Sequence, residues 1–263
     1  MWKLLERLVF NMRYVLVTGA TSGIGIAISR VFARKGYGIV MVSSSQKHLM
    51  QAERNMAKRF PKTSIYTIEE DLSRKNSAQS LYNKVKEIGI TIDILVNNAG
   101  KGLIGATEKI NINSDEELLY LNMVTPTILC KLFLRDMYKR KHGSILNVAS
   151  TAAFQPGPYN STYFASKAYL YSYSRAIRHE AAKHGVHVCT LCPGTTDTKF
   201  FEKEGIKTPA WAMSAVKVAE YAADGLCKNK PVIIPGKTNK LFSIIPSEIK
   251  LIAISLLKKP QTK

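Results

Sequence analysis

An apolar run leads directly into a glycine-rich turn in Tyr14-Val15-Leu16-Val17-Thr18-Gly19-Ala20-Thr21-Ser22-Gly23-Ile24-Gly25. Apolar residues then recur at helical spacing up to Gly36, a plausible helix stop. A strand, a glycine turn and a helix in this order bind dinucleotides. Gly19 permits the tight turn, Gly23 lets a pyrophosphate approach the backbone, and Gly25 lets the helix pack on the strand. The spacing differs from the general Gly-x-Gly-x-x-Gly fingerprint, so the turn alone is weak evidence.

Strand-like apolar runs alternate with helical stretches along the rest of the chain. These runs cover residues 14–18, 38–43, 64–68, 92–97, 144–149, 186–192 and 232–234. The alternation predicts an α/β fold, namely a single doubly wound Rossmann domain with a mostly parallel seven-stranded sheet flanked by helices. A length of 263 residues and a hydrophobic content of 46% suit one large domain with a continuous core. Ligands bind such sheets at the carboxyl ends of the strands.

Tyr163 and Lys167 form a second motif, with Ser150 thirteen residues before the tyrosine. Residues four apart share a helix face, so the lysine ammonium can lie close to the phenol. A nearby cation favours the phenolate and moves a group with an ordinary pKa of about 10 toward neutrality, where it exchanges protons at useful rates. The pair indicates a proton-transfer site, although the spacing alone also occurs on solvated helix faces.

With these motifs the chain resembles the short-chain dehydrogenase/reductase family from Arg13 to about Gly236. The matching segments are the turn Thr18–Gly25, the pair Asp71-Leu72, the run Asn97-Asn98-Ala99-Gly100, the series Asn122, Ser150, Tyr163 and Lys167, and Pro193-Gly194-Thr195-Thr196-Asp197-Thr198. The resemblance implies an oxidoreductase that transfers a hydride between a nicotinamide and a carbonyl carbon. It is specific for fold and reaction class and says little about the substrate, because this family acts on many carbonyl compounds.

The resemblance also implies a role for each catalytic candidate. Tyr163 donates the proton, Ser150 positions and polarises the carbonyl oxygen, and Lys167 lowers the pKa of Tyr163 and holds the nicotinamide ribose. Asn122 lies in a long helical stretch, where the resemblance implies a bound water that relays protons to Lys167. A mid-helix asparagine is slightly unfavourable, which favours function over packing.

The cofactor is expected along the carboxyl edge of the sheet. The candidate cofactor-binding residues are Gly19, Thr21, Ser22, Gly23, Ile24, Gly25, Ser43, Ser44, Ser45, Asp71, Leu72, Asn98, Ala99, Gly100, Tyr163, Lys167, Pro193, Gly194, Thr196 and Thr198. By the resemblance Asp71 meets the adenine, whereas its alternative is a helix N-cap, for which Ser73 competes. Thr198 and the backbone around Pro193 and Gly194 are expected to orient the carboxamide.

The end of the second predicted strand, Val42-Ser43-Ser44-Ser45-Gln46-Lys47, bears on the choice of cofactor. An enzyme that selects NAD usually places a carboxylate there, which binds the ribose 2′-hydroxyl and would repel a 2′-phosphate. This chain has none, while three serines can donate hydrogen bonds to a phosphate and Lys47 adds charge. We therefore expect NADP in preference to NAD. NADP-preferring members of the family often carry an arginine near the position of Ser44 or a basic residue near that of Ser22. Both are absent from this sequence.

The four cysteines show no disulfide framework, and we find neither a cleavable signal peptide nor an apolar span of 18 residues. A cytoplasmic setting is therefore expected. Cys189 and Cys192 have the spacing of a redox or zinc pair, but strand alternation points the two thiols to opposite faces. We expect buried structural cysteines and no metal.

The expected catalytic domain spans residues 13–236 and follows an N-terminal extension at 1–12, although Met12 can also serve as the natural start. A substrate lid is expected at about 197–213. Pocket residues are expected from Lys101–Leu103, Phe154–Tyr159 and residues 199–213, an apolar lining that suits a lipid-like ketone or secondary alcohol, such as a steroid or acyl chain. Aromatic residues in a lid can equally cover the cofactor. The alternative function is a catalytically silent cofactor-binding scaffold. Loss of a catalytic residue would favour it, but all four candidate catalytic residues are present.

The formal net charge of +19 is concentrated near the end of the chain, where residues 228–263 hold eight lysines against Glu248. A basic apolar tail at 237–263, like residues 1–10, can lie in a membrane interface. We favour the alternative that the tail packs on the domain or on another subunit, because its apolar residues surround more than one helix face. No nucleic-acid-binding motif occurs. The resemblance implies a homodimer or homotetramer.

Overall fold

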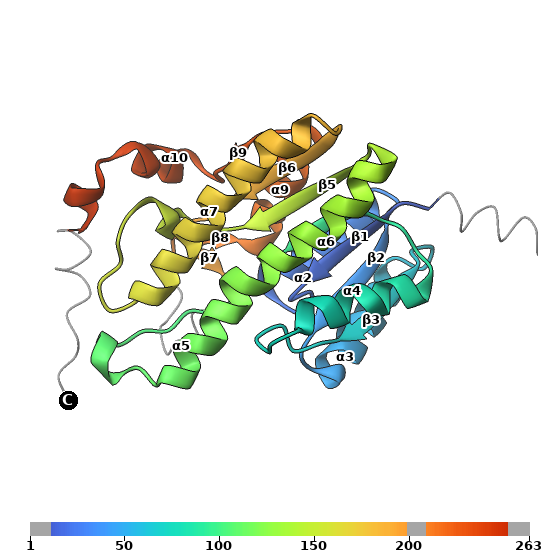
Figure 1. The fold of residues 1–263 in the computed structure, drawn as a ribbon, viewed down its shortest axis with the longest axis horizontal. Helices are drawn as coiled ribbons and strands as arrows, with labels where there is room; N and C mark the ends of the chain where they lie inside the picture. The colour runs from blue at the N-terminus through green and yellow to red at the C-terminus, as the bar shows by residue number, and fades with distance from the viewer. Residues whose placement is uncertain (1–11, 199–208, 252–263) are drawn as a thin grey trace, which may run out of the picture.

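The structure, a computed structural model, describes residues 12–198 and 209–251. Its main sheet has seven parallel strands in the order β3-β2-β1-β4-β5-β6-β9 (Figure 1). The strands are β1 (Tyr14–Thr18), β2 (Gly38–Ser43), β3 (Ile65–Glu69), β4 (Ile92–Asn97), β5 (Gly143–Val148), β6 (Val186–Leu191) and β9 (Val232–Ile233). The predicted fold class is confirmed, and each strand begins and ends within one residue of its predicted bounds.

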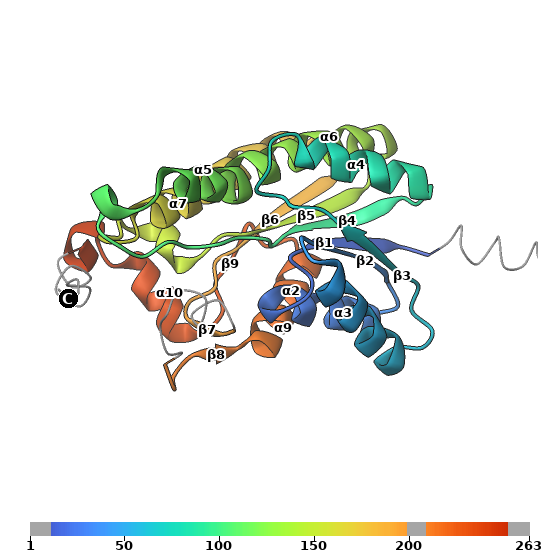
Figure 2. The same ribbon diagram turned by 90° about the horizontal axis from the view of Figure 1, so that it is seen from below.

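Helices cover both faces of this sheet (Figure 2). One face carries α2 (Gly23–Arg34), α3 (Gln46–Arg59) and α9 (Ala215–Cys227), and the other carries α4 (Ser77–Ile88), α5 (Ile112–Leu119), α6 (Thr125–Arg140) and α7 (Ser161–Ala182). Strand side chains alternate between two cores, so that Val15 and Val17 pack under α2 while Tyr14 and Leu16 pack on the opposite side. Because both faces are buried, the strands are continuous apolar runs.

The strand order reverses between β1 and β4, since β2 and β3 extend the sheet on one side and β4, β5 and β6 on the other. In sheets of this kind the ligand crevice lies at the carboxyl ends of the strands beside the reversal. The glycine turn follows β1, the run Asn98-Ala99-Gly100 follows β4, and Ser150 follows β5. The topology therefore brings the predicted motifs to one edge.

Two short strands lie outside the main sheet and were not predicted. β7 (Thr196–Asp197) and β8 (Met213–Ser214) form a parallel pair. They flank much of the predicted lid, of which residues 199–208, with Phe200 and Phe201, lie outside the described residues. The same holds for residues 1–11 of the predicted extension and 252–263 of the predicted tail. The described part of that tail contains α10 (Lys237–Ile244).

One helical stretch, Ile112–Arg140, is long and apolar enough to cross a membrane by length and composition, with a mean hydropathy of 1.3. This corrects the expectation that no apolar span of 18 residues occurs. Of its most apolar 18 residues, 44% are buried. Leu129, Phe133 and Met137, on α6, pack in the core. Core helices of soluble domains have the same composition, and the α6 part of this stretch packs as such a helix.

Cys189 and Cys192 are buried, as predicted, and neither belongs to a disulfide. Burial raises the pKa of Cys189 to about 11 and that of Cys192 to about 12, because desolvation disfavours the thiolate. Both thiols therefore stay protonated near neutral pH and act as small apolar side chains.

Candidate active site

The glycine turn after β1 depends on two glycines for different reasons. Gly19 has a φ of +65°, in the left-handed region that favours glycine. At Gly25 the helix approaches the turn so closely that an added Cβ would lie 2.2 Å from the Gly19 carbonyl oxygen. These backbone features agree with the roles predicted for the two glycines. The contact predicted between Gly23 and a pyrophosphate stays a prediction.

The end of β4 clamps this turn. Asn98 Nδ2 donates to the carbonyl oxygens of Thr18, at 2.8 Å, and Gly19, at 3.3 Å. The Thr18 hydroxyl accepts hydrogen bonds from the backbone N–H groups of Asn98 and Ala99, both at 2.9 Å. Sequence analysis did not single out the Thr18 side chain. The sequence indicates this role only in that Thr18 is a polar residue at the end of an otherwise apolar strand.

The first turn of α2 has no side-chain cap. Ser22 occupies the N-cap position without a side-chain hydrogen bond to the helix, and no acidic residue lies in the first turn. The first N–H groups of a helix lack intrahelical acceptors, and the positive end of the helix dipole attracts anions. The local structure therefore suits a phosphate at this turn.

Lys167 lies on α7 and is a buried cation, with 5% of its surface exposed, whose side chain reaches the end of β5. Its Nζ donates to the Val148 carbonyl oxygen at 3.0 Å and lies 5.7 Å from the centroid of the Tyr163 ring. This proximity agrees with the i,i+4 prediction. Burial lowers the pKa of Lys167 to about 8, because desolvation disfavours the ammonium form.

Asn122 and Lys167 converge beside Gly100. A Cβ at Gly100 would lie 3.2 Å from Asn122 Oδ1 and 3.3 Å from Lys167 Nζ, so any larger residue would crowd both polar atoms. Asn122 is held from two sides. It accepts from the Lys101 N–H at 3.1 Å, and its Nδ2 donates to the Lys101 carbonyl at 2.9 Å and to Ser166 Oγ at 3.0 Å. The sequence did not reveal Ser166 as a partner.

The long helical stretch predicted around Asn122 is present, but it is not a regular α-helix. Residues Tyr120–Val124 form a π-helical turn, and the Thr125 N–H donates to the Tyr120 carbonyl, five residues back. Pro126 explains the irregularity, because it has no N–H for the Asn122 carbonyl and its ring crowds that oxygen. Such turns occur frequently at functional sites. Pro126 was the sequence signal that could have predicted the turn.

Ser150 begins the loop after β5 and is tied to the segment that follows β6. Its hydroxyl accepts from the Ala152 N–H at 3.1 Å and donates to the Pro193 carbonyl at 3.5 Å. The Thr151 N–H donates to the same carbonyl at 2.9 Å. The Ser150 loop and the Pro193 segment therefore hold each other in place.

The Pro193 segment also reaches the glycine turn. Thr196 Oγ1 donates to the Gly194 carbonyl at 2.9 Å, which fixes the bend after Pro193. The side chain of Thr198 lies over Gly23, where an added Cβ would come within 3.1 Å of Thr198 Cγ2. Two predicted cofactor segments that are far apart in the sequence therefore lie side by side.

Two hydroxyl groups meet at the end of β2. Thr21 Oγ1 lies 3.3 Å from Ser43 Oγ, within hydrogen-bond reach. Ser45 caps α3 by accepting from the His48 N–H at 3.4 Å, and Ser44 is exposed. Ser44 is therefore accessible from the solvent, whereas Ser43 lies beside Thr21 and Ser45 caps α3.

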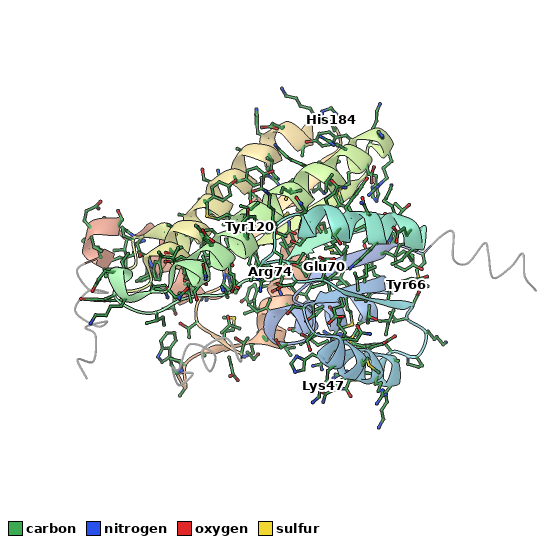
Figure 3. All side chains as sticks on the ribbon, turned by 60° about the horizontal axis from the view of Figure 1, so that its bottom comes forward. Lys47, Tyr66, Glu70, Arg74, Tyr120 and His184 are labelled. Carbon is green, nitrogen blue, oxygen red and sulfur yellow. The ribbon has the colours of Figure 1, made fainter. Side chains whose placement is uncertain are left out.

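A carboxylate nearby escaped the sequence analysis. Glu69, the last residue of β3, pairs in register with Ser43, and its Oε1 accepts from the Gln46 N–H at 2.9 Å. Lys47, labelled in Figure 3, lies exposed on the first turn of the same helix. At this end of α3, the Lys47 ammonium would attract a phosphate and the Glu69 carboxylate would repel it. Only the register between β2 and β3 reveals Glu69.

Asp71 stabilises the turn after β3. It accepts from Ser73, at 3.1 Å from the N–H and 2.6 Å from the hydroxyl, and from Arg74 Nε at 3.1 Å. Partial burial opposes its ionisation, but these hydrogen bonds hold the Asp71 pKa below its usual range. The N-cap alternative is wrong, because the helix begins at Ser77 after Asn76. Contact with adenine stays a prediction for Asp71 and its buried neighbour Leu72.

A chain of ion pairs runs from Asp71 to the loop that Asn122 holds. Arg74, labelled in Figure 3, pairs with Glu117 at 3.5 Å, and Glu117 pairs with Lys101 Nζ at 2.7 Å. Lys101 lowers the pKa of Glu117 through this hydrogen bond and through its charge. The pairs are partly exposed, so each contributes little to stability.

Two of the predicted pocket segments lie together. The Gly105 N–H donates to the Tyr159 carbonyl at 2.9 Å, which joins the loop after Lys101–Leu103 to Phe154–Tyr159. Lys250 Nζ donates to the Phe154 carbonyl at 2.9 Å from 96 positions along the chain. No local sequence signal indicates this contact of Lys250.

The buried lysine makes stability depend on pH. The ordinary pKa of 10.5 falls to about 8 in the fold, so between these values the unfolded chain binds more protons and stability rises with pH. We expect Lys167→Met to be more stable than the wild type below pH 8, by about 3 kcal/mol, because it removes a desolvated charge. This difference should shrink as the pH approaches 10.5.

Urea unfolding at several pH values measures this difference. The exposed Lys58→Met serves as the control and should differ little from the wild type at every pH. A stability difference for Lys167→Met that stays constant between pH 8 and 10.5 would contradict a lowered lysine pKa.

Comparison with known proteins agrees with this arrangement. The family model of the short chain dehydrogenases matches residues 13–208. The ketoacyl reductase HetN of Nostoc sp. is 33% identical over 211 residues, covering 77% of this chain and 73% of the relative. Hydroxysteroid dehydrogenase-like protein 1 of Gallus gallus is 29% identical over 225 residues, covering 83% and 67%. A short-chain dehydrogenase from Sphingobium yanoikuyae, solved in complex with NADPH, superimposes with a TM-score of 0.82 at 25% identity, covering 96% and 99%. The chain belongs to the short-chain dehydrogenase family of oxidoreductases.

Proposed function

We propose that this protein transfers a hydride between NADP(H) and a ketone or the corresponding secondary alcohol, with a lipid-like molecule as substrate. One observation carries the proposal. The Lys167 ammonium is buried 5.7 Å from the centroid of the Tyr163 ring, at the carboxyl end of β5. A cation held there favours the charged form of a neighbouring phenol, which suits proton exchange with a substrate oxygen.

The residues around the sheet edge fit a nicotinamide dinucleotide. The left-handed Gly19, the close packing at Gly25 and the uncapped first turn of α2 leave backbone N–H groups for a pyrophosphate. Thr198 beside Gly23 encloses the same turn from the other side. When bound, the nicotinamide supplies or accepts the hydride.

Tyr163 and Ser150 act on the substrate oxygen in this proposal. The Tyr163 phenol donates the proton when a carbonyl is reduced, and it accepts one when an alcohol is oxidised. The Ser150 hydroxyl polarises the same oxygen. Its bond to the Pro193 carbonyl is long, at 3.5 Å, so the hydroxyl can turn to a substrate at little cost.

Asn122 and Lys167 return the proton to Tyr163. Their polar side-chain atoms face one point beside Gly100. The side-chain oxygen Oδ1 of Asn122 keeps a second lone pair after it accepts from the Lys101 N–H. A water at this point could bridge Asn122 Oδ1 and Lys167 Nζ. Together with the lysine, it connects Tyr163 to the solvent.

The preference for NADP rests on the hydroxyl groups of Thr21 and Ser43, on the exposed Lys47, and on the lack of a carboxylate at the end of β2. The Sphingobium relative binds NADPH. Glu69 acts against the preference, because its carboxylate lies at the α3 N-terminus. We infer that neutral hydroxyl donors outweigh this carboxylate, whose charge is exposed and screened.

The lipid-like substrate is proposed from the apolar segments around the site and from the names of two relatives. One is a ketoacyl reductase, and the other is a hydroxysteroid dehydrogenase-like protein. Both names point to carbonyl groups on large apolar molecules. Apolar pockets recognise such substrates mainly through buried area, with a few polar groups that orient the reacting oxygen.

Tyr163→Phe is expected to lower kcat by at least about a hundredfold, because the ring stays and only the proton donor is lost. The dissociation constant for NADPH, measured by fluorescence titration, should change little. Tyr171→Phe, on the same helix, is the control and should retain activity. A Tyr163→Phe enzyme with most of its turnover would disprove the assigned role.

The wild type is expected to have a lower KM for NADPH than for NADH, and Ser43→Asp should reverse the preference by placing a carboxylate against the 2′-phosphate. Glu69→Gln should lower the KM for NADPH and leave that for NADH nearly unchanged, since it removes a charge close to the phosphate alone. Steady-state kinetics with both cofactors measures the effect. Equal use of both by the wild type would contradict the assignment.

A panel of ketones, followed at the NADPH absorbance band, tests the substrate class. We expect kcat/KM for ketosteroids or long 3-oxoacyl thioesters to exceed that for small polar ketones by at least about tenfold, because several buried methylene groups each contribute about 0.8 kcal/mol. Preference for small polar carbonyls would contradict the lipid-like substrate. Tight NADPH binding without turnover on the whole panel would favour a silent scaffold.

A further inference from the structure

Helix α10 presents an apolar and basic face to the solvent. Lys237, Lys240, Leu241 and Ile244 lie at positions i, i+3, i+4 and i+7, which share one face of a helix. All four are exposed, Leu241 at 63% and Ile244 at 76%. A surface helix ordinarily turns its apolar stripe toward the protein. In α10, Leu241 and Ile244 instead lie on the side that faces the solvent.

The opposite face of α10 is attached to the domain. Asn239 packs so closely on Gly194 that a Cβ added to the glycine would lie 2.4 Å from Asn239 Oδ1. Asn239 Nδ2 also donates to the Pro235 carbonyl at 2.7 Å, a local bond at the start of the helix. The buried Lys250 lies 5.3 Å from the centroid of the Phe242 ring and donates to the Phe154 carbonyl. These contacts fix which side of α10 faces outward.

Another exposed aliphatic residue follows α10 in the chain. Ile249 is 60% exposed, and the sequence beyond the described residues proceeds as Ile252-Ala253-Ile254-Ser255-Leu256-Leu257-Lys258-Lys259. Figure 1 and Figure 2 both show α10 at the end of the molecule far from α3. The exposed side chains of Leu241, Ile244 and Ile249 therefore lie within one short stretch of the described chain.

We propose that the exposed face of α10, formed by Lys237, Lys240, Leu241 and Ile244, docks with Ile249 on an anionic lipid membrane. The aliphatic side chains would enter the boundary between headgroups and acyl chains, and the lysines would contact acidic headgroups. The charge is complementary, since residues 228–263 carry eight lysines against Glu248 within a chain of net charge +19.

Charge also argues against a second copy of this chain as the occupant. A two-fold contact through this face would place Lys237 and Lys240 of both copies in one interface without an acidic residue from the face, and like charges in an interface disfavour association. Three aliphatic side chains alone form a small patch for a stable protein interface. A lipid surface needs only partial insertion of the same side chains.

Docking would bring the candidate site close to the bilayer. Helix α10 rests on Gly194 and, through Phe242 and Lys250, on Phe154, the two loops next to Ser150. A lipid-like substrate would then reach the site from the membrane rather than from water. This consequence rests on the proposed function, whereas docking itself does not.

Co-sedimentation of the full chain with vesicles tests the proposal. The vesicles contain phosphatidylcholine with about one third phosphatidylserine, or phosphatidylcholine alone. We expect Leu241→Gln/Ile244→Gln/Ile249→Gln to weaken partitioning into the anionic vesicles at least about tenfold. Lys237→Gln/Lys240→Gln should weaken it about fivefold per lysine at low salt, and added salt should weaken wild-type binding.

Two controls separate docking from other effects. Met50→Gln/Val216→Gln removes exposed apolar side chains from α3 and α9 and should bind vesicles like the wild type, as should Lys58→Gln/Lys62→Gln. All variants should keep the wild-type unfolding midpoint and their activity on a soluble ketone, if the wild type has any. Wild-type protein that ignores anionic vesicles would overturn the proposal. So would an unchanged partition for the triple variant, or a triple variant that alters oligomer size while binding vesicles normally.

Discussion

The interior position of the Lys167 ammonium constrains everything built around it. Among the described residues no carboxylate forms an ion pair with Lys167, so a backbone carbonyl and an aromatic ring replace the lost water. Such an environment favours the neutral amine and lowers the pKa to about 8. The fold therefore holds a charge where it is costly, which is typical of functional sites rather than of cores.

The surrounding backbone is arranged to admit that charge. Gly100 leaves room above Lys167 and Asn122 because it has no Cβ. Pro126 interrupts the helix, and the wider turn at Tyr120–Val124 carries Asn122 to a position where its amide joins Lys101 and Ser166. A regular α-helix would leave the Asn122 backbone carbonyl without its partner four residues on, because Pro126 has no N–H. The site therefore depends on an irregular turn as much as on its side chains.

The sheet was predictable because strands buried on both faces leave continuous apolar runs, and its motifs were predictable because they end those runs. Position along the chain therefore placed Ser150 and Asn98 at the correct edge. Features that depend on register or on distant contacts were not predictable. Glu69 reaches the α3 N-terminus only because β3 pairs with β2, and Lys250 meets Phe154 across 96 positions.

The C-terminal segment shows why composition alone could not decide between packing and exposure. Its apolar residues occur on more than one side of α10, and the fold separates them. Asn239 and Phe242 face the domain, while Leu241 and Ile244 face outward. On the domain side, Asn239 packs on Gly194, and Lys250 lies beside the Phe242 ring while it donates to the Phe154 carbonyl. Either orientation of α10 would therefore leave some of its apolar side chains toward the solvent. In the proposed docking, an anionic lipid surface would cover the outer ones.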